Sequence, residues 1–101
     1  MQNLTSLAQT VGTLLIERKQ TLAISESSSG GLISAALLSI PGASAYFMGG
    51  GVIYTHRARE VLLGIDFKEH PGVRSSSEPY ALLAANTIRE RLGTYWGLAE
   101  T

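Results

Sequence analysis

The chain has 101 residues, of which 45% are hydrophobic and 16% charged, a composition that suits one globular domain spanning residues 1–101. Eight Lys and Arg balance eight Asp and Glu, and this zero net charge argues against binding to nucleic acid or to a membrane surface. There is no cysteine, and His56 and His70 are not spaced as zinc ligands, so we expect no metal site. No apolar run reaches the ~20 residues of a membrane span, and the N-terminus lacks a signal pattern. We therefore expect a cytoplasmic domain.

The first part of the chain predicts a helix, a buried strand and a second helix. Apolar residues recur at helical spacing over 3–18, and a short apolar run over 21–25 is typical of a buried strand. A Ser/Gly loop follows over 26–31, and the second helix starts at Leu32 and stops at Pro41-Gly42. The first helix is predicted to be amphipathic, with Leu4, Leu7, Val11, Leu14 and Leu15 on one face.

The rest of the chain continues the alternation. A strand is predicted over 46–54, and its glycine triplet indicates a bulge or a close backbone approach. A short helix over 57–63 ends at Gly64, and residues 66–74 are irregular. Ser77 is the expected N-cap of a further helix that Gly93 closes. A last strand over 95–99 is expected to bury Trp96.

Strands that alternate with helices predict an α/β fold with an open sheet. Only three strands are expected, so the sheet is thin and its edges are open to self-association. Ligands of such sheets bind at the carboxyl ends of the strands, and the last strand ends almost with the chain. We therefore expect the fold to be incomplete at its C-terminal end.

The segment Ser25-Glu-Ser-Ser-Ser-Gly-Gly31 is the most informative one for chemistry. Small residues between a strand and a helix present free N–H groups that attract an anion or a developing oxyanion. The hydroxyls of Ser27, Ser28 and Ser29 are candidates for a nucleophile or ligand donors, but local chemistry alone favours ordinary helix caps. The segment lacks the lysine of a phosphate-binding P-loop and the Gly-x-Ser-x-Gly of a nucleophile elbow.

Two further polar groups lie near predicted strand ends. Ser44 follows the Pro41-Gly42 turn, and Tyr54 ends the second strand. If the first two strands are neighbours, we expect the strand end at Tyr54 to converge with the serine segment. Taken singly, each of these residues also fits an ordinary exposed position. The residues that follow Tyr54 are Thr55, His56, Arg57 and, two further on, Arg59.

Four motifs follow one another along the chain: residues 26–31 (Glu-Ser-Ser-Ser-Gly-Gly), 41–47 (Pro-Gly-Ala-Ser-Ala-Tyr-Phe), 51–54 (Gly-Val-Ile-Tyr) and 61–64 (Val-Leu-Leu-Gly). In this order they resemble the C-terminal domain of the CinA family, the competence/damage-inducible proteins, which includes stand-alone nicotinamide mononucleotide deamidases. The resemblance extends from about Leu14 to Thr101. It implies a three-layer α/β/α sandwich with an open, mostly parallel sheet.

The resemblance also implies a function. The expected reaction is hydrolysis of the carboxamide of nicotinamide mononucleotide to nicotinate mononucleotide and ammonia by a serine nucleophile, without a cofactor and in a homo-oligomer. Ser27 is the expected nucleophile, with Ser44 next, and Tyr54 is the expected proton relay or donor to the leaving ammonia. The N–H groups of the glycine turn would hold the oxyanion. The substrate-binding residues by this resemblance are Ser29, Gly30, Gly31, Arg57 and Arg59.

Three departures from the family pattern bear on activity. Arg59 stands where the family has a lysine, and arginine stays protonated, so it is not a base. Ser28-Ser29 replaces Cys-Thr, and Thr55-His56 replaces Ser-Asn, which makes His56 a candidate for the missing base. The family continues past the last strand into a further loop of the pocket, where this sequence ends.

Two other interpretations follow from these departures. One is a catalytically inactive CinA-like module that binds a nucleotide or a protein partner. The other is a plain structural domain, which predicts no stabilisation by any ligand.

Overall fold

The computed structural model describes residues 2–101 and confirms the predicted alternation of helices and strands. Short 3-10 turns (η1, Ala43–Ala45; η3, Phe67–Glu69) and a π-helical turn (η2, Arg59–Leu63) join the longer elements. No helix within residues 2–101 is long and apolar enough to cross a bilayer. The helices and strands are α1 (Gln2–Arg18), β1 (Leu22–Glu26), α2 (Leu32–Leu38), β2 (Phe47–Val52), α3 (His56–Ala58), α4 (Glu78–Leu92) and β3 (Trp96–Ala99).

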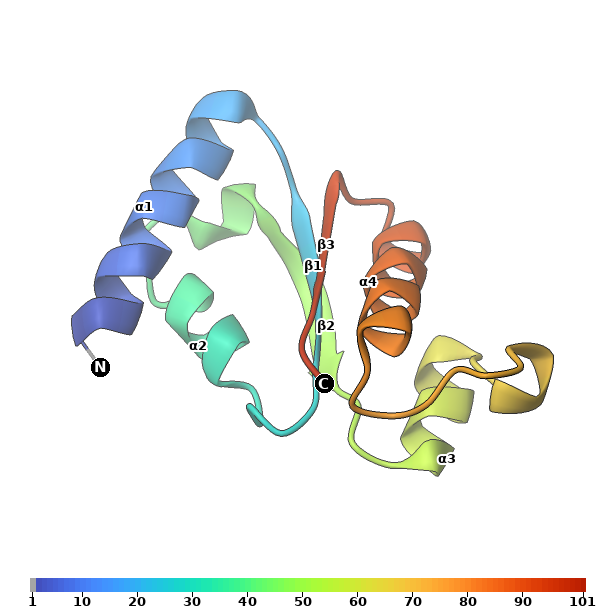
Figure 1. The fold of residues 1–101 in the computed structure, drawn as a ribbon. Coiled ribbons are helices and arrows are strands. Elements are labelled where there is room, and N and C mark those ends of the chain that lie inside the picture. Colours follow the sequence, from blue (N-terminus) through green and yellow to red (C-terminus); the bar gives the residue numbers. More distant parts are fainter. Residues whose placement is uncertain (1) are drawn as a thin grey trace.

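The three strands form one parallel sheet in the order β2-β1-β3. Helices α1 and α2 cover one face of this sheet and α4 covers the other, so the expected three-layer sandwich is confirmed (Figure 1). The central strand β1 is buried along its whole length because it has a strand on each side and helices on both faces. As a result, the residues that follow β1 emerge at the middle of the carboxyl edge.

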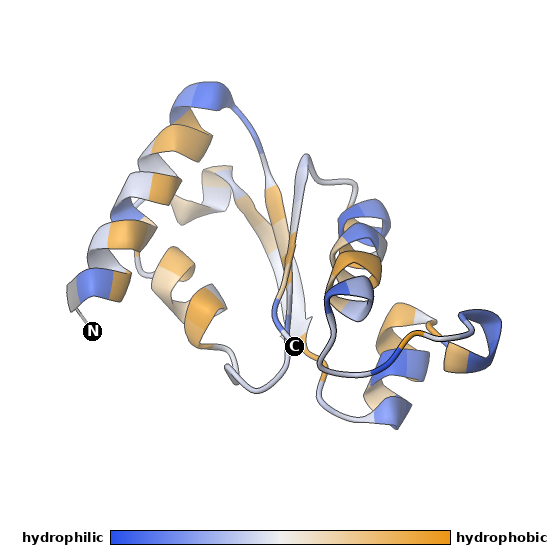
Figure 2. Cartoon of the chain, in the orientation of Figure 1, coloured by the Kyte–Doolittle hydropathy of each residue, from blue (hydrophilic) through white to orange (hydrophobic). Residues whose placement is uncertain are grey.

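Each face of the sheet has its own hydrophobic core. Leu22 and Ile24 point toward α1 and α2, whereas Ala23 between them points toward α4. This alternation is the two-residue period of a strand. On the α1 and α2 side, the hydrophobic residues of both helices turn toward the sheet (Figure 2). Tyr46 is fully buried there, and a Cβ added to Gly12 would lie 3.0 Å from its hydroxyl.

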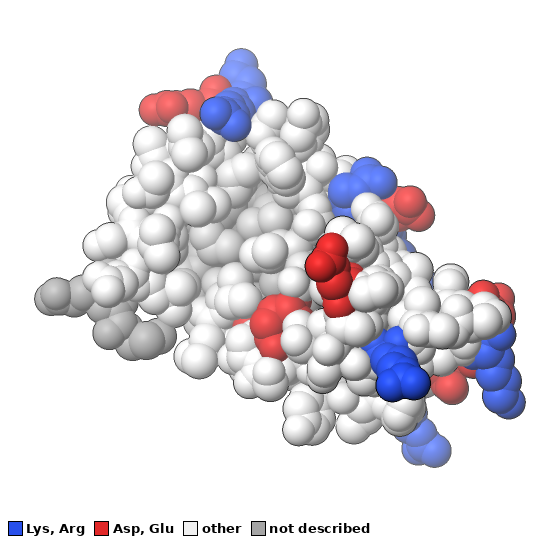
Figure 3. Space-filling model, viewed as in Figure 1, with Lys and Arg blue, Asp and Glu red and all other residues white. Residues whose placement is uncertain are grey.

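The apolar face of α1 is only partly used. Ala8 and Leu15 are buried, but Leu7, Val11 and Leu14 of the predicted apolar face are 63%, 40% and 41% exposed. The reason is that β3 is an edge strand and leaves the sheet too narrow to cover the helix. An apolar groove of about 350 Å³ lies between α1, α2 and β3, and Figure 3 shows this hollow as mostly uncharged surface; Arg18 is the charged residue in its lining.

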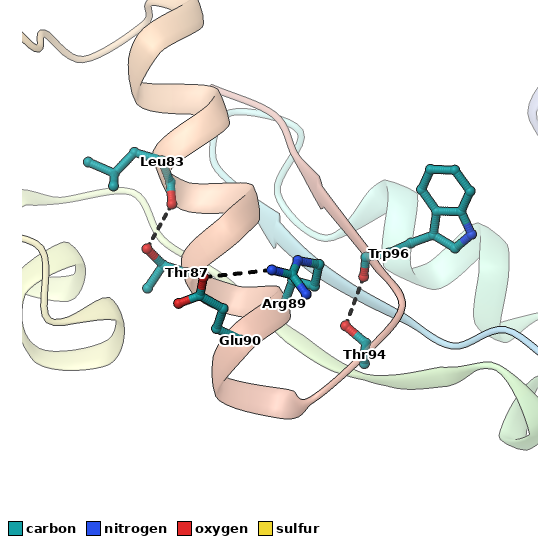
Figure 4. A network of polar contacts seen from close by, with 6 residues as sticks. All are labelled: Leu83, Thr87, Arg89, Glu90, Thr94 and Trp96. Atoms are coloured by element: carbon teal, nitrogen blue, oxygen red, sulfur yellow. Dashed lines mark hydrogen bonds and ion pairs between the residues drawn. The ribbon is translucent and has the colours of Figure 1, made fainter.

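Trp96 lies on the same uncovered side, against expectation. Its side chain points away from α4 (Figure 4), the residue is 47% exposed, and its indole N–H donates to Gln20 Oε1 at 2.9 Å. The opposite face of β3 leaves no room for a ring, because a Cβ at Gly97 would overlap the Ala85 carbonyl oxygen of α4. The backbone of the turn before β3 is held by the Thr94 hydroxyl, which donates to the Trp96 carbonyl oxygen at 2.8 Å.

The ends of α4 are those that the sequence predicts. The Ser77 hydroxyl accepts from the Tyr80 N–H at 3.3 Å, and Gly93 adopts the left-handed conformation that closes the helix. Tyr80, Ala84 and Ile88 form the face that packs on the sheet. A short connection then leads from the end of α4 at Leu92 to the start of β3 at Trp96.

The glycine triplet of β2 marks the bulge that the sequence indicates. The register with β1 shifts between Leu22, opposite Phe47, and Ala23, opposite Gly49. Gly49 has a φ of 153°, and a Cβ at Gly50 would overlap the carbonyl oxygen of Ile24. At Gly51, by contrast, a Cβ would meet only the Ile53 Cδ1 atom at 3.4 Å. Strands β1 and β2 therefore approach each other through a backbone contact that only glycine at position 50 allows.

Gly50→Ala should lower the free energy of unfolding by about 3 kcal/mol, because the added methyl group forces the edge strand β2 away from the central strand β1. The matched variant Gly51→Ala should change it by no more than about 1 kcal/mol. Urea denaturation of the two variants and the parent measures the difference. Equal stability of both variants would contradict the close approach at position 50.

Candidate functional site

The serine loop, residues 27–31, crosses the carboxyl edge of the sheet between β1 and α2. The Gly30 N–H donates to the Ser27 carbonyl oxygen at 3.0 Å, and Leu32 N–H donates to the Ser29 carbonyl oxygen at 3.1 Å. Gly30 and Gly31 have φ values of 64° and 98°, a backbone region that strongly favours glycine. The loop can therefore turn sharply enough to aim its other N–H groups outward.

Glu26, at the end of β1, closes the inner side of this loop. Its carboxylate accepts from the backbone N–H groups of Ile33 at 3.0 Å and Ser34 at 2.8 Å, the second and third residues of α2. The Ser29 hydroxyl donates to the same carboxylate at 2.7 Å. Glu26 is only 1% exposed, so this is a buried carboxylate that caps a helix from a neighbouring strand. The serine side chains, which the sequence offers as caps, do not fill that role at α2.

Glu100, directly after β3, closes the outer side of the loop. Its carboxylate accepts from the backbone N–H groups of Ser27 at 2.7 Å and Ser29 at 3.0 Å. The Ser28 hydroxyl donates to it at 2.8 Å, and the Ser29 hydroxyl forms a further, short hydrogen bond. We call these four groups the anion cradle: the N–H groups of Ser27 and Ser29 and the hydroxyls of Ser28 and Ser29.

The hydrogen bonds lower the pKa of both carboxyl groups. For Glu100, the bonds from the Ser29 hydroxyl and the Ser27 N–H lower the pKa from 4.5 to about 2. For Glu26, burial raises the pKa, but the hydrogen bonds from Ser34, Ser29 and Ile33 outweigh burial, so the net direction is down. Both groups are therefore charged at neutral pH. Within residues 2–101 neither carboxylate forms an ion pair with a basic side chain.

The donors of the cradle differ from those expected. The sequence suggests the N–H groups of the glycine turn as the oxyanion donors, but the Gly30 N–H is used inside the turn. The donors that point out of the loop are the N–H groups of Ser27 and Ser29, and both donate to the Glu100 carboxylate. The glycines remain necessary, because their positive φ values produce the turn that orients these two N–H groups.

Tyr54 lies at the same edge as the serine loop. Strand β2 runs parallel to β1, Val52 is opposite Glu26, and the Ile53 N–H donates to the Glu26 carbonyl oxygen at 2.6 Å. A Cβ at Gly31 would lie 3.7 Å from Val52 Cγ2, so the loop and the end of β2 are in contact. Tyr54 lies just after Val52 in the chain and is 70% exposed. The expected convergence of the two strand ends is confirmed.

Ser44 lies at the other end of the sheet. It belongs to the turn η1 that precedes β2, and β2 begins opposite Leu22, the first residue of β1. Ser27 follows the last residue of β1. Within one copy of the chain, the structure therefore does not bring Ser44 together with Ser27.

Arg59 is buried on the α4 side of the sheet, and its contacts there are with residues outside the serine loop. Its guanidinium lies 3.9 Å from the ring centre of Phe67 and 4.7 Å from that of Tyr80, and the residue is 6% exposed. It donates to the Ser75 hydroxyl at 2.8 Å and to His56 Nδ1 at 2.9 Å. Because arginine only donates, His56 Nδ1 is the acceptor, so His56 is paired with Arg59 rather than with a serine. Arg57 is exposed on α3.

Sequence reasoning did not assign a role to either glutamate of the site. Glu26 belongs to the serine-rich motif, but a loop separates it from Leu32, the first residue of α2, so no local capping pattern pointed to its role. Glu100 carried no signal in the sequence, because its partners lie far from it along the chain; Ser29 is 71 positions earlier. In the part of the chain that the structure describes, no three His, Asp or Glu side chains gather as a metal site would require.

The comparison with known families decides the relationship. The family model of the CinA C-terminal domain matches residues 4–101. The chain belongs to the CinA C-terminal domain family. Curated relatives include CinA-like proteins of Trichodesmium erythraeum, 40% identical, and of Synechocystis, 42% identical, each over 95% of this chain. The chain spans 23% of the length of each of these two proteins.

Solved structures of the family have the same fold. A competence/damage-inducible protein from Agrobacterium tumefaciens is 29% identical with a TM-score of 0.81, and the match covers 95% of this chain and 57% of that one. A CinA superfamily protein from Klebsiella pneumoniae has a TM-score of 0.82 at 24% identity, which shows the fold alone, over 90% of this chain and 57% of that one. The CinA fold is thus established for this chain.

Glu26→Ala should lower the free energy of unfolding by about 2 kcal/mol, because it leaves two partly buried N–H groups at the start of α2 without an acceptor. The exposed Glu17→Ala in α1 is the control and should change the stability by less than about 0.5 kcal/mol. Thermal and urea denaturation of both variants give the comparison. Equal losses in the two variants would show that the cap at α2 contributes nothing.

Acid should weaken the link between Glu100 and the serine loop. A pKa lowered in the folded state stabilises the fold fully above the ordinary value of 4.5 and loses that effect as the pH falls toward 2. The stability difference between the parent and Glu100→Gln should therefore shrink steadily from about pH 5 to about pH 2. Urea titrations across this range measure it, with Glu17→Gln as the control. A difference that does not change with pH would refute the lowered pKa.

Proposed function

We propose that this CinA domain is an amidohydrolase that converts nicotinamide mononucleotide to nicotinate mononucleotide and ammonia. The observation that carries the proposal is the anion cradle, in which two backbone N–H groups and two hydroxyls bind a carboxylate. Such a set of donors is suited to the negative oxygen that develops when an amide carbonyl is attacked. Its place at the carboxyl edge of a parallel sheet is where α/β folds bind ligands.

The proposed nucleophile is the Ser27 hydroxyl. Its oxygen attacks the carboxamide carbon, the carbonyl oxygen becomes negative, and the C–N bond then breaks to leave an ester on Ser27. The proton of the Ser27 hydroxyl passes to the departing nitrogen, which leaves as ammonia. Water then hydrolyses the ester and releases the carboxylate product.

Tyr54 is the proposed relay for this proton. Tyr54 is exposed and follows the end of β2, the strand next to β1, and its hydroxyl can both accept a proton and donate one. Glu100 is a poor candidate for the base, because a carboxyl group with a pKa of about 2 has little affinity for a proton at neutral pH. His56 is a poor candidate as well, because its Nδ1 is bound to Arg59.

A second candidate function is a non-catalytic CinA module that binds a nucleotide or a protein partner. Two observations favour it. Arg59, at the position of the family's lysine, is buried against Phe67 and Tyr80, and the cradle already holds the Glu100 carboxylate. For this candidate, we expect nicotinamide mononucleotide to raise the melting temperature without any release of ammonia.

Ammonia release from nicotinamide mononucleotide tests the enzyme. Removal of the nucleophile in Ser27→Ala should lower kcat by roughly 1000-fold or more, and Tyr54→Phe should lower it about 100-fold. Ser44→Ala tests the alternative nucleophile and should retain activity, as should the control Ser6→Ala in α1. Full activity in Ser27→Ala would exclude Ser27 as the nucleophile. A folded parent protein that releases no ammonia would exclude the deamidase for this substrate.

A further inference from the structure

The Glu100 side chain is an anion that the chain itself places in the cradle. It connects the residue that follows β3 to a loop 71 to 73 residues earlier. Both carboxylate oxygens are used, Oε1 by Ser27 and Ser29 and Oε2 by Ser28. Donors of this kind and number are those that bind the carboxylate or phosphate group of a ligand. A ligand anion and the Glu100 carboxylate therefore require the same atoms.

The hold on Glu100 is weakened by a second carboxylate. The Ser29 hydroxyl is within hydrogen-bonding distance of oxygens of both Glu26 and Glu100, but it has only one proton to donate. When this proton serves Glu26, the Glu100 oxygen faces a hydroxyl lone pair, and the two carboxylates repel each other. No basic side chain of residues 2–101 forms an ion pair with either glutamate to offset that repulsion.

Departure of the Glu100 carboxylate does not require the backbone to move. The Glu100 N–H donates to the Ser25 carbonyl oxygen at 3.0 Å, and the Thr101 hydroxyl accepts from the Ser76 N–H at 3.3 Å. These bonds hold the main chain at the end of β3. The side chain is only partly buried, so rotation about its own bonds moves the carboxylate from the loop into solvent.

We infer that Glu100 is an autoinhibitory side chain, whose carboxylate occupies the anion cradle and competes with the anionic group of a ligand at the serine loop. This inference rests on the proposed function in one respect, that the ligand binds at the serine loop. It does not depend on hydrolysis of the amide. It predicts that loss of the Glu100 charge strengthens the binding of small oxyanions. It also predicts that ligand binding releases Glu100 from Ser27 and Ser29.

Titration with inorganic phosphate and, separately, with nicotinate tests the competition, with the amide NMR signals of Ser27 and Ser29 as the readout. The phosphate arm and the carboxylate arm show which oxyanion the cradle prefers. Glu100→Ala should bind the preferred anion at least about tenfold more tightly than the parent. The anion affinity of Glu100→Gln should lie between those of the parent and Glu100→Ala, because the glutamine amide oxygen still accepts hydrogen bonds but carries no charge. The exposed Glu17→Gln should bind like the parent.

Equal affinity in the parent and in a folded Glu100→Gln or Glu100→Ala would overturn the inference. If Glu100→Ala fails to fold, Glu100→Asp replaces it. Its carboxylate is one methylene shorter, so it should bind the cradle less well and should also bind the anion more tightly than the parent does. Tighter anion binding by the variants without ammonia release would support autoinhibition by Glu100 and exclude the proposed amidohydrolase activity. Ammonia release with unchanged anion affinity in the variants would support the amidohydrolase activity and exclude autoinhibition by Glu100.

Discussion

The geometry of the serine loop depends on the hydrogen bonds between the Glu26 carboxylate and the start of α2. The carboxylate belongs to the central strand, yet it accepts the N–H groups of Ile33 and Ser34 at the start of α2. One buried side chain thereby joins the end of β1 to the beginning of the next helix. The loop between them must close over that carboxylate, and Gly30 and Gly31 supply the positive φ values that let it do so. The outward N–H groups of Ser27 and Ser29 are the consequence.

Negative charge at this edge is stabilised by neutral donors rather than by basic side chains. Glu26 lies inside the loop and Glu100 outside it, with the Ser29 hydroxyl between them. Serine hydroxyls and backbone N–H groups lower the pKa of both carboxyl groups without an ion pair from residues 2–101. The same neutral donors suit a transient oxyanion, which links the observed contacts to the proposed acyl transfer.

The remaining unusual features lie outside the serine loop. Arg59 stabilises the α4 side by stacking on Phe67 and Tyr80, and Ser44 lies at the amino end of β2. The apolar groove between α1, α2 and β3 lies on the opposite face of the sheet from α4. The chain spans 57% of the solved chain from Agrobacterium tumefaciens, and self-association through the open edges of the sheet stays a prediction.

The sequence by itself determined the elements, their order, the glycine positions and the serine loop, because local periodicity and turn chemistry depend on neighbouring residues alone. It also carried the family motifs. Only the tertiary structure decided which strand ends meet, and so separated Ser44 from Ser27 while bringing Tyr54 to the same edge as the loop. It alone revealed Glu100 as the occupant of the cradle, placed Trp96 on an uncovered face and buried Arg59. These outcomes depend on contacts between residues far apart in the chain, which sheet order and layer packing create and no local pattern encodes.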